Sequence, residues 1–571
     1  MKFNGKNYEL KVWEGQQLNN VIAIDTETTY VNSFTETPDL VTFQAFDGVF
    51  PYYVRKEEVL EFLEKHKECT WVFANASFDL DVLEKEVDWN FYNQIDNNGV
   101  YDVLIMYCLY HLATVGITPY QFSLAKVADV ILDIQLPKDS EIRENFEQFK
   151  EKQIEQIPLK FLEYGAKDVI VTYDAYHKLK EMTNRVAPGS SLSHQIQIAG
   201  SIALNRVYKN GIGVDHKRAN ELLIQLEKEK NTCQEILTTY GWRRGLNSKT
   251  FFNIAIEDQL TEEELKNLPV MQGGEYSTKE EDLNQFRSNR FIDTYLRFIR
   301  IEKTITFFKD LVGNSSVHPR YSLLRNTGRT SCSKPNFQQL PREGDVRSLF
   351  VADEGKTFII TDYSAIELST LAQTLYDRYG SSIMRNKINQ GVDLHKYYAS
   401  ILFSVPESSV EKWQRQAAKA ANFGFPGGLG IETFTKFAKG YNLNINIDEA
   451  SRMKSAWFDA FPEMKQYLQG ELGYVWTRSG RLRANTTFCA EKNTPFQGMA
   501  ADGAKLALWN LTKAGFKVVG FVHDEIICEV PINEVEFKKK QMEKIMVDSM
   551  QNIVPDVKIG VESTISERYC K

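Results

Sequence analysis

Acidic residues at the ends of apolar segments are the first candidates for chemistry in this sequence. Two short apolar strings, 518–522 and 526–530, flank His523, Asp524 and Glu525. This pattern is typical of a tight hairpin whose strands are buried and whose tip exposes two carboxylates. Such a pair is costly without a cation, so the tip could bind a divalent metal, although acidic dipeptides are also common at solvated turns.

A second group of acids lies in the first third of the chain. A predicted buried strand leads into Asp25 and Glu27, whose side chains would share one face of that strand. Asp79 lies where another predicted strand gives way to a helix, and Tyr164 and Asp168 share one helix face at i,i+4 spacing. Each could be a strand-end or capping residue. Together they could also hold two divalent ions and a water for phosphodiester hydrolysis.

Two further segments carry candidate residues. Asp362 ends a predicted strand, and Glu367 follows in the first turn of a helix, where a capping box with Ser364 is the simplest interpretation. Another predicted helix places Arg415 and Lys419 one turn apart among alanines. Such a pair can clamp a polyphosphate, although a lone basic pair also suits a solvated face.

The elements that would position these residues fall into two parts. Strands alternate with helices in the first third, which is typical of an α/β domain. The stretch 187–193 is rich in Pro, Gly and Ser and is the best candidate for a domain boundary. Pro426 is expected to end the Arg415 helix near Phe425, because the residue before proline avoids the α conformation.

The composition is that of a folded protein with several domains: 571 residues, 43% hydrophobic and 25% charged. We expect no signal, transit or transmembrane segment and no membrane partner. The seven scattered cysteines favour a reducing compartment, which predicts a cytoplasmic location, in the host cell if the protein is viral. The net charge of −8 does not suggest a nucleic-acid partner, but a local basic channel can coexist with an acidic exterior.

The N-terminal acids resemble the three motifs of the DnaQ-like 3′–5′ proofreading exonucleases, which read D-x-E, N-x-x-x-D and Y-x-x-x-D in this order. The resemblance implies an RNase H-like α/β fold. It also implies that Tyr164 orients the attacking water. The implied ligands of two Mg²⁺ ions are Asp25, Glu27, Asp79 and Asp168.

The later segments resemble motifs A, B and C of family A DNA polymerases, with phage-type enzymes as the expected subclass. The motifs are DYSAIEL from Asp362, R-x-x-x-K-x-x-x-F-G from Arg415 and VHDE from Val522. The resemblance, which covers roughly residues 20–565 with the exonuclease motifs, implies a right-hand polymerase of palm, fingers and thumb. Further signatures follow the same order at 327–341, 393–395, 477–483 and 493–502.

By this resemblance, Asp362 and Asp524 hold two Mg²⁺ ions, for which Mn²⁺ is expected to substitute, and the Tyr363 backbone is a further ligand. Glu525 is auxiliary, and Lys419 offsets charge on the leaving group. Glu367 would exclude a ribose 2′-OH. The implied dNTP-binding residues are Tyr363, Glu367, His395, Arg415, Lys419 and Phe423. The implied contacts to primer or template are Arg329, Gln338, Gln497 and His523.

The sequence departs from the polymerase pattern at three points. Gly427 stands where a template-stacking tyrosine is usual, and Cys489 stands where an arginine is usual. Too few residues separate Lys303 from Arg329 for the thumb insertion that binds thioredoxin, so thioredoxin is not an expected partner. No 5′-nuclease domain is expected, since the exonuclease motifs begin almost at the first residue.

The prediction is therefore a DNA polymerase with proofreading, serving replication of a phage or phage-like element. Its expected partners are primer–template DNA, dNTPs and a replicative helicase-primase. The alternatives are a nuclease whose polymerase half only grips DNA, and a single-subunit RNA polymerase-like enzyme. The predicted domains are an exonuclease at 1–190 and a polymerase at 191–571, with the thumb at about 195–320, the palm at about 321–375 and 490–571, and the fingers at about 376–489.

Overall fold

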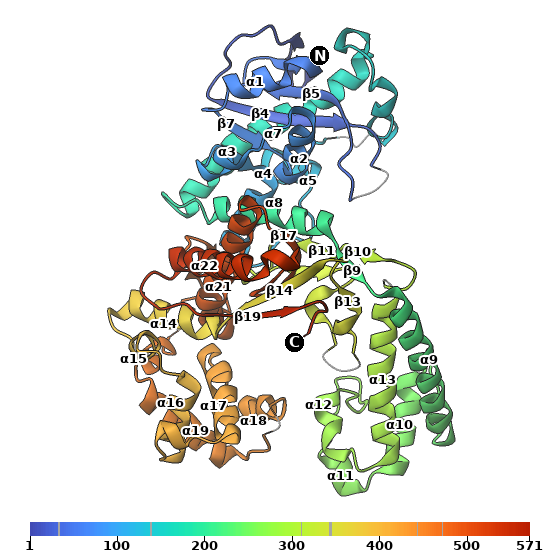
Figure 1. Cartoon of the computed structure of the whole chain (residues 1–571), viewed down its shortest axis with the longest axis vertical. Coiled ribbons are helices and arrows are strands. Elements are labelled where there is room, and N and C mark those ends of the chain that lie inside the picture. The colour runs from blue at the N-terminus through green and yellow to red at the C-terminus, as the bar shows by residue number, and fades with distance from the viewer. Residues whose placement is uncertain are drawn as a thin grey trace.

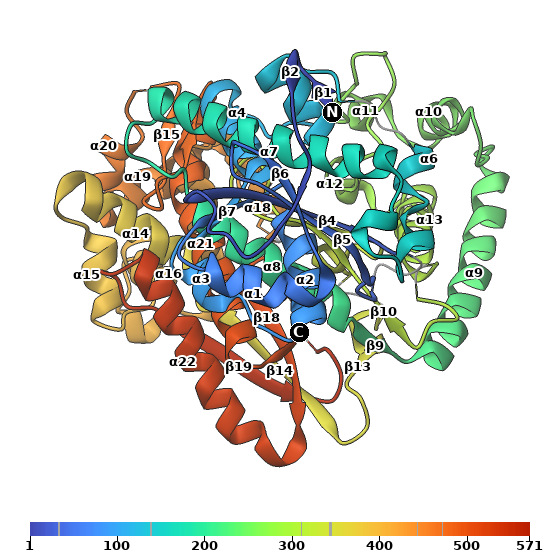
Figure 2. The same ribbon diagram turned by 90° about the horizontal axis from the view of Figure 1, so that it is seen from above.

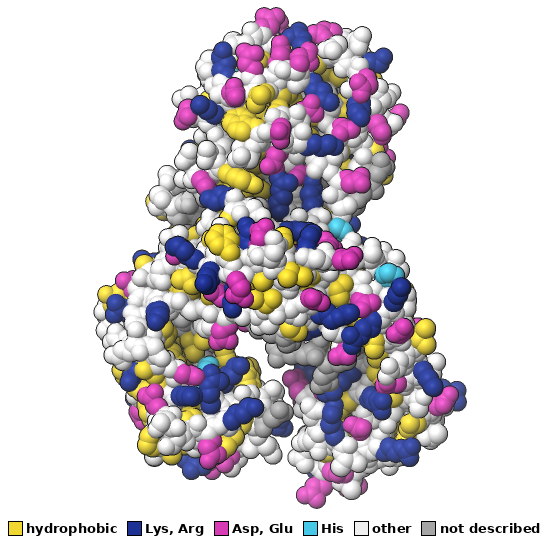
Figure 3. Space-filling model, in the orientation of Figure 1, with side chains coloured by type: hydrophobic (Ala, Val, Ile, Leu, Met, Phe, Trp, Pro, Cys, Tyr) yellow, Lys and Arg dark blue, Asp and Glu magenta, His cyan; other side chains and the backbone are white. Residues whose placement is uncertain are grey.

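The computed structural model describes residues 1–31, 35–136, 140–309, 311–341, 345–441, 443–470 and 472–570. An N-terminal lobe stands above a central sheet, from which two helical arms extend with an open space between them (Figures 1 and 3). From above, the lobe lies between α9 (His216–Thr239) and α14 (Ile366–Tyr379) (Figure 2). Within the ranges just given, every helix is too short or too polar to cross a bilayer.

The N-terminal lobe is built on a mixed six-stranded sheet in the order β3-β6-β5-β4-β7-β8. Its centre is β4 (Val21–Thr28), which pairs antiparallel with β5 (Leu40–Phe46) and parallel with β7 (Thr70–Phe73). The outer strands are β3 (Lys11–Val12), β6 (Pro51–Val54) and β8 (Val100–Asp102). Strands and helices alternate as predicted, in agreement with the expected RNase H-like α/β fold.

Three helices pack around this sheet. α2 (Ala76–Val87) follows β7 directly, and α4 (Val103–Val115) follows β8 and is capped by the Asp102 carboxylate. The long α7 (Leu159–Val186) packs across β4 and β5. Because apolar residues recur along one face of α7, that face is buried and brings Asp168 close to β4.

The central sheet of the second part has four antiparallel strands in the order β17-β18-β14-β19. Its strands are β14 (Lys356–Tyr363), β17 (Lys517–Val522), β18 (Glu525–Pro531) and β19 (Val561–Ser566). The predicted hairpin is confirmed as β17 and β18. The register places Asp362 opposite Glu525 on β18 and opposite Glu562 on β19, so one acidic position from each strand lies at this end of the sheet.

Long helices support the central sheet. α21 (Phe488–Lys513) packs against α22 (Val535–Ile553) and against α8 (His194–Asn210). A Cβ at Gly503 of α21 would collide with Met550 of α22, so glycine is needed for this close approach. The sheet therefore rests on a rigid base of tightly packed helices.

The two arms are helical. One contains α9, α10 (Ser248–Gln259) and α13 (Arg290–Phe308), which enclose their own apolar core. The other is built from α16 (Leu394–Phe403), α17 (Lys412–Gly424), α18 (Ile431–Lys439) and α19 (Ile447–Ala460). As predicted, α17 ends just before Phe425 and buries its alanines. Arms and sheet agree with the expected thumb, fingers and palm.

Direct hydrogen bonds fasten the N-terminal lobe to the second part. Trp509 Nε1 of α21 donates to the Asp96 carboxylate at 2.8 Å. Arg483 Nε donates to the carbonyl oxygen of Gly116 at 2.9 Å. These bonds join residues that lie far apart in the sequence. The lobe therefore contacts the second part directly, in addition to the covalent connection between them.

The connection at 187–193 differs from an exposed linker. It joins α7 to α8, but Leu192 and Ser193 are buried, and Ser190 Oγ donates to the Gly480 carbonyl oxygen at 2.8 Å. The Pro, Gly and Ser residues signal a turn here, and the docking of the lobe packs that turn against the second part.

Candidate active sites

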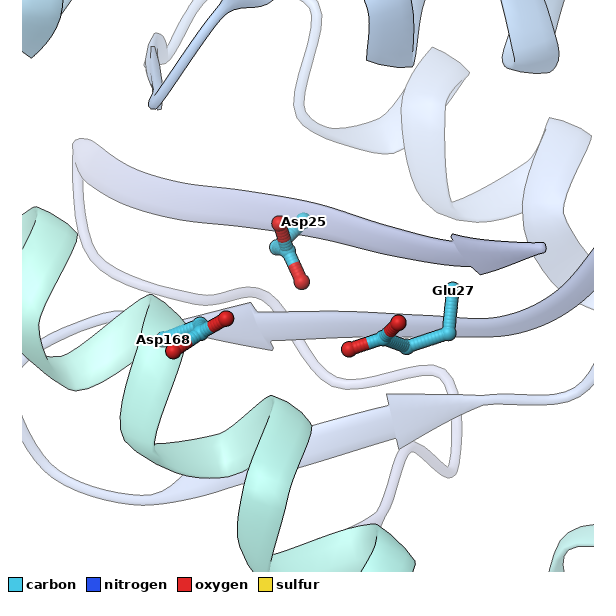
Figure 4. A group of neighbouring side chains, drawn as sticks. All are labelled: Asp25, Glu27 and Asp168. Carbon is cyan, nitrogen blue, oxygen red and sulfur yellow. The ribbon is translucent and has the colours of Figure 1, made fainter. Parts of the chain in front are cut away.

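Three of the predicted acids converge in the N-terminal lobe. Asp25 and Glu27 project from β4, and Asp168 faces them from α7 (Figure 4). One carboxylate oxygen from each lies within 4.8 Å of the others. Alternation along the strand puts residues 25 and 27 on one face, as the sequence predicts. A cluster of oxygen donors suits a hard divalent cation such as Mg²⁺.

Asp79 and Tyr164 flank this cluster. The Asp79 carboxylate accepts hydrogen bonds from the backbone nitrogen and Oγ1 of Thr26, at 3.0 and 2.8 Å. Thr26 faces the opposite side of β4 from its neighbours, so Asp79 lies outside the group of three. Tyr164 precedes Asp168 by one turn of α7, as the predicted i,i+4 spacing requires.

Burial and mutual repulsion both disfavour the ionised forms of the clustered acids. Burial raises the pKa of Asp25 to about 7, although Gln44 Nε2 donates to its carboxylate at 2.6 Å and lowers it. Burial and the negative charge of Asp25 raise the pKa of Glu27 and of Asp168 well above the usual range. Arg143 lowers these pKa values. Among the described residues, the positive charge near the cluster is too small to balance its negative charge, and a bound metal ion would supply the balance.

The sequence did not indicate Gln44 or Arg143. Gln44 lies on β5, directly opposite Asp25 in the register of the sheet. Neither residue belongs to a motif. An alternating strand pattern could have placed Gln44 on the face shared with Asp25, but only after the pairing of β4 with β5 was known.

Asp25→Asn is expected to stabilise the metal-free protein at high pH. The pKa of Asp25 is about 7 in the folded protein and 3.8 in an unperturbed chain, so the free energy of unfolding falls as pH rises between these values. The variant avoids that loss. Its free energy of unfolding should exceed that of the unaltered protein by about 1–3 kcal/mol near pH 8 but by little near pH 4. Thermal unfolding in a chelator measures the difference.

Asp39 provides a control of opposite sign for this experiment. Lys150 and Lys85 lower the pKa of Asp39 to about 2, so its ionised form stabilises the fold above its unfolded pKa. Asp39→Asn should therefore lower the melting temperature near pH 8. Equal pH responses in the two variants would contradict the assignment of a repulsive acidic cluster.

A cavity of about 730 Å³ lies at the Asp362 end of the central sheet, where the sheet meets the arm of α16 to α19 (left in Figure 1). It brings together acids of the sheet and cations of α17. Lys and Arg side chains gather on the inner side of that arm, facing the hollow (Figure 3). The predicted residues that line the cavity are Asp362, Tyr363, Glu367, His395, Arg415, Lys419, Phe423 and Asp524.

The hairpin acids are not equivalent. Both carboxylates line the same cavity, and burial, and then the charge of Asp362, raises the pKa of Asp524 to about 7. The expectation that the tip exposes both acids is wrong for Glu525. Glu525 is the first residue of β18, is buried, and accepts a hydrogen bond from the Tyr569 hydroxyl at 2.7 Å.

The Tyr363 side chain points away from the acids. It is buried, and its hydroxyl donates to the carbonyl oxygen of Met546 on α22 at 2.7 Å. Only the backbone of Tyr363 is therefore available to a metal, in line with the role that the resemblance implies.

Neighbouring groups position Arg415 and His395 in this cavity. Arg415 Nε donates to the Asp393 carboxylate at 2.8 Å. The buried His395 ring contacts Phe423, with centroids 5.7 Å apart, and its Nδ1 lies 3.0 Å from Asn422 Nδ2. Burial lowers the pKa of His395 to about 4, so the ring is neutral near pH 7.

Glu367 forms an ion pair with Arg329. The capping box is wrong, because α14 begins at Ile366 after Ala365 in the left-handed conformation and has no side-chain cap. Ser364 Oγ instead donates to Glu562 on β19 at 3.3 Å. The Glu367 carboxylate is therefore directed by a residue distant in the sequence and not by its own helix terminus.

The other predicted DNA contacts lie on three elements near the hairpin. His523 is exposed at the turn, with φ +61°. Gln497 is half-buried on α21. Gln338 is buried, and its Nε2 donates to Thr330 Oγ1 at 2.7 Å, so this amide is already engaged in the protein.

Several cavity residues were missed, two charged ones among them. Lys558 and Glu562 line the cavity from the segment that enters β19 and from β19 itself. Neither belongs to a recognisable motif, and the pairing of β19 with β14 places Glu562 opposite Asp362.

The two substitutions in the polymerase pattern are neighbours in space. A Cβ at Gly427 would lie 2.5–2.9 Å from the Asn493 side chain, so a larger residue does not fit unless Asn493 moves. Asn493 Nδ2 donates to the carbonyl oxygen of Cys489 at 2.8 Å. Both departures therefore lie where the end of α17 meets α21.

A second cavity of about 930 Å³ lies between the N-terminal lobe and the second part. Asn75, Phe78 and Asp81 line it from the start of α2, which also carries Asp79. The exposed Tyr120 and Phe122 and the basic Arg320 and Arg325 form other parts of its wall.

Comparison with known proteins covers both parts. Residues 6–184 match the model for 3′-5′ exonuclease, and residues 217–571 match that for DNA polymerase family A. A protein of Aquifex aeolicus described as DNA polymerase I is 31% identical over 446 residues, which are 72% of this chain and 76% of that protein. A DNA polymerase I of Chloroflexus aurantiacus is 28% identical over 436 residues, 70% of this chain but 45% of that protein.

A solved structure shares the fold of nearly the whole chain. It is the POL domain of Pol1 from M. smegmatis in complex with DNA primer-template and dNTP. The two chains superpose with a TM-score of 0.76 over 97% of this chain and 96% of that one, at 20% sequence identity.

Proposed function

Because the chain belongs to DNA polymerase family A and carries a 3′–5′ exonuclease domain, we propose that it copies DNA from a primer and proofreads its own product. One observation carries the polymerase half of this proposal. A single cavity joins the acids of the central sheet to the cations of α17 and to Glu367. Family membership disfavours the alternative of an RNA polymerase-like enzyme.

Each side chain of the polymerase cavity has a distinct task. Arg415 and Lys419 bind the triphosphate, with Arg415 oriented by Asp393. The neutral His395 donates a hydrogen bond to a phosphate without adding charge, and Phe423 packs beside the sugar. Asp362 and Asp524 would hold two Mg²⁺ ions together with the Tyr363 backbone. When bound, these ions lower the pKa of the primer 3′-OH and neutralise the leaving pyrophosphate.

The exonuclease half uses a separate constellation. Asp25, Glu27 and Asp168 would hold Mg²⁺, with Asp79 as a more distant ligand, and Tyr164 would orient the attacking water. The 930 Å³ cavity beside α2 is a route for a single-stranded 3′ end, because aromatic rings stack on bases while arginines follow the phosphates.

We assign residues 1–190 to the exonuclease and 191–571 to the polymerase, with the arm of α9 to α13 as thumb and the arm of α16 to α19 as fingers. Arg329, Gln338, Gln497 and His523 would contact primer or template. Replication of a phage-like element and a helicase-primase partner stay predictions.

The test uses the purified full chain, a 5′-labelled primer annealed to a longer template, and Mg²⁺. With dNTPs the primer should lengthen to the end of the template, and without dNTPs it should shorten stepwise from its 3′ end. Shortening without any lengthening would favour the nuclease alternative, whereas lengthening without shortening would refute the exonuclease assignment.

Glu367→Ala is expected to weaken discrimination against ribonucleotides by at least about tenfold. We expect the ion pair with Arg329 to hold the Glu367 carboxylate where a ribose 2′-OH would otherwise fit. Competing incorporation of dNTPs and NTPs by the same primer measures the ratio. Glu367→Gln keeps the side-chain volume and should retain most of the discrimination. Equal use of both nucleotides by the unaltered protein would refute the role of Glu367.

A further inference from the structure

A fully buried ionic cluster lies outside both active sites. Arg481, Asp502 and Lys505 are 1%, 0% and 1% exposed. Arg481 Nη1 donates to both carboxylate oxygens of Asp502, at 2.6 and 2.9 Å. Burying charges is costly, and a buried ion pair often adds no stability over apolar residues. Stability alone therefore does not explain this cluster.

The backbone makes room for the two cations. A Cβ at Gly328 or at Gly498 would collide with the Arg481 guanidinium. A Cβ at Gly200 of α8 would lie 3.1–3.2 Å from carbons of the Lys505 side chain. Three glycines from separate elements thus allow the chain to close around these two side chains.

The cluster is anchored on rigid elements. Asp502 and Lys505 come from α21, and Gln197 of α8 joins them. The Gln197 amide donates to Asp502 at 3.0 Å and accepts from Lys505 Nζ at 2.6 Å. Both helices belong to the buried base of the central sheet, so the positions of the two cations are well defined.

The other ends of both cations reach the backbone just before Arg329. Lys505 Nζ donates to the carbonyl oxygen of Gly328 at 2.8 Å. Arg481 Nη2 donates to that of Thr327 at 3.4 Å. The next residue, Arg329, forms the ion pair with Glu367, which lines the polymerase cavity.

We propose that Lys505 and Arg481 are positioning residues for the polymerase reaction: they fix the backbone at 327–328 so that the Arg329 guanidinium is held against Glu367. The proposal rests on the proposed polymerase function. It predicts that a buried lysine, remote from the nucleotide, controls both primer extension and sugar discrimination.

The main variant is Lys505→Met, which keeps an unbranched stem and removes the donor to Gly328. It should lower kcat/KM for primer extension at least about tenfold and weaken discrimination against ribonucleotides. In an Arg329→Ala background the same change should alter both quantities less than about twofold, because the residue through which Lys505 acts is gone. Shortening of single-stranded DNA by the exonuclease should not change.

Lys492→Met is the matched control. Lys492 is also buried on α21, but it pairs with Glu491 at 2.9 Å. A loss of melting temperature in this variant without a change in sugar discrimination is expected. If it altered discrimination as much as Lys505→Met, the effect would be a general consequence of disturbing α21, and the proposal would fail.

Two further outcomes decide the proposal. An equal effect of Lys505→Met with and without Arg329 would overturn it. If Lys505→Met does not fold, Gly200→Ala, which only crowds the Lys505 stem, is measured in its place. It should shift extension and discrimination in the same direction, and no shift would count against the proposal. An unaltered protein that cannot extend primers would instead refute the proposed function.

Discussion

Replacing Asp524 with asparagine is expected to slow primer extension by about three orders of magnitude or more. Asp524 and Asp362 come from the turn after β17 and from β14, and the charge of Asp362 helps to raise the pKa of Asp524. A bound divalent cation would offset this repulsion, and an amide is a much weaker ligand for such an ion than a carboxylate. Single-nucleotide addition under single-turnover conditions measures the rate.

Two controls make the Asp524 result specific. Shortening of single-stranded DNA should be unchanged, because the exonuclease acids lie in the N-terminal lobe. Glu562→Gln removes a charge from the same cavity without removing a proposed ligand and should reduce extension far less. If Asp524→Asn left extension within a few-fold of normal, the metal site would have to be assigned to other acids.

The second large effect is expected from the double substitution of Asp25 and Glu27 by alanine. Removing two of the three clustered acids leaves only Asp168 of the cluster, with Asp79 outside it, to hold the ions, so 3′–5′ shortening should fall by at least about a thousandfold. Primer extension should remain largely intact. Time courses on a labelled single strand and on a primer–template pair give the two rates.

A double substitution of Glu61 and Glu64 by alanine removes the same charge from the exposed face of α1 (Val59–Lys65). It should leave both activities unchanged. Persistent shortening by the Asp25 and Glu27 variant, with the control equally active, would mean that the exonuclease site lies elsewhere.

Residues whose positions follow from local periodicity could be predicted from the sequence. Asp25 and Glu27 share a face because a strand repeats every two residues, and Tyr164 and Asp168 share one because of the i,i+4 repeat of a helix. The hairpin of β17 and β18 followed from its two apolar strings. The helix of Arg415 and Lys419 followed from its alanines and from Pro426.

Positions that depend on partners distant in the sequence could not be predicted in this way. Glu367 fits a capping box locally, but Arg329 draws it into an ion pair. Glu525 belongs to an acidic tip by pattern, yet it is buried and accepts a hydrogen bond from Tyr569, which follows 44 residues later in the sequence. Likewise Lys558 and Glu562 reach the cavity only through the pairing of β19 with β14.

The docking of the N-terminal lobe has a consequence for error correction. The bonds from Trp509 to Asp96 and from Arg483 to Gly116 fix the spacing between the two active sites. Under the proposed function, the DNA 3′ end must therefore move between the two sites, and it has to separate from its template strand first. A mismatched end unpairs at lower cost than a matched one. The ratio of primer extension to 3′–5′ removal is then governed by melting of the last base pairs, so it should depend on the temperature and on the base composition of the DNA.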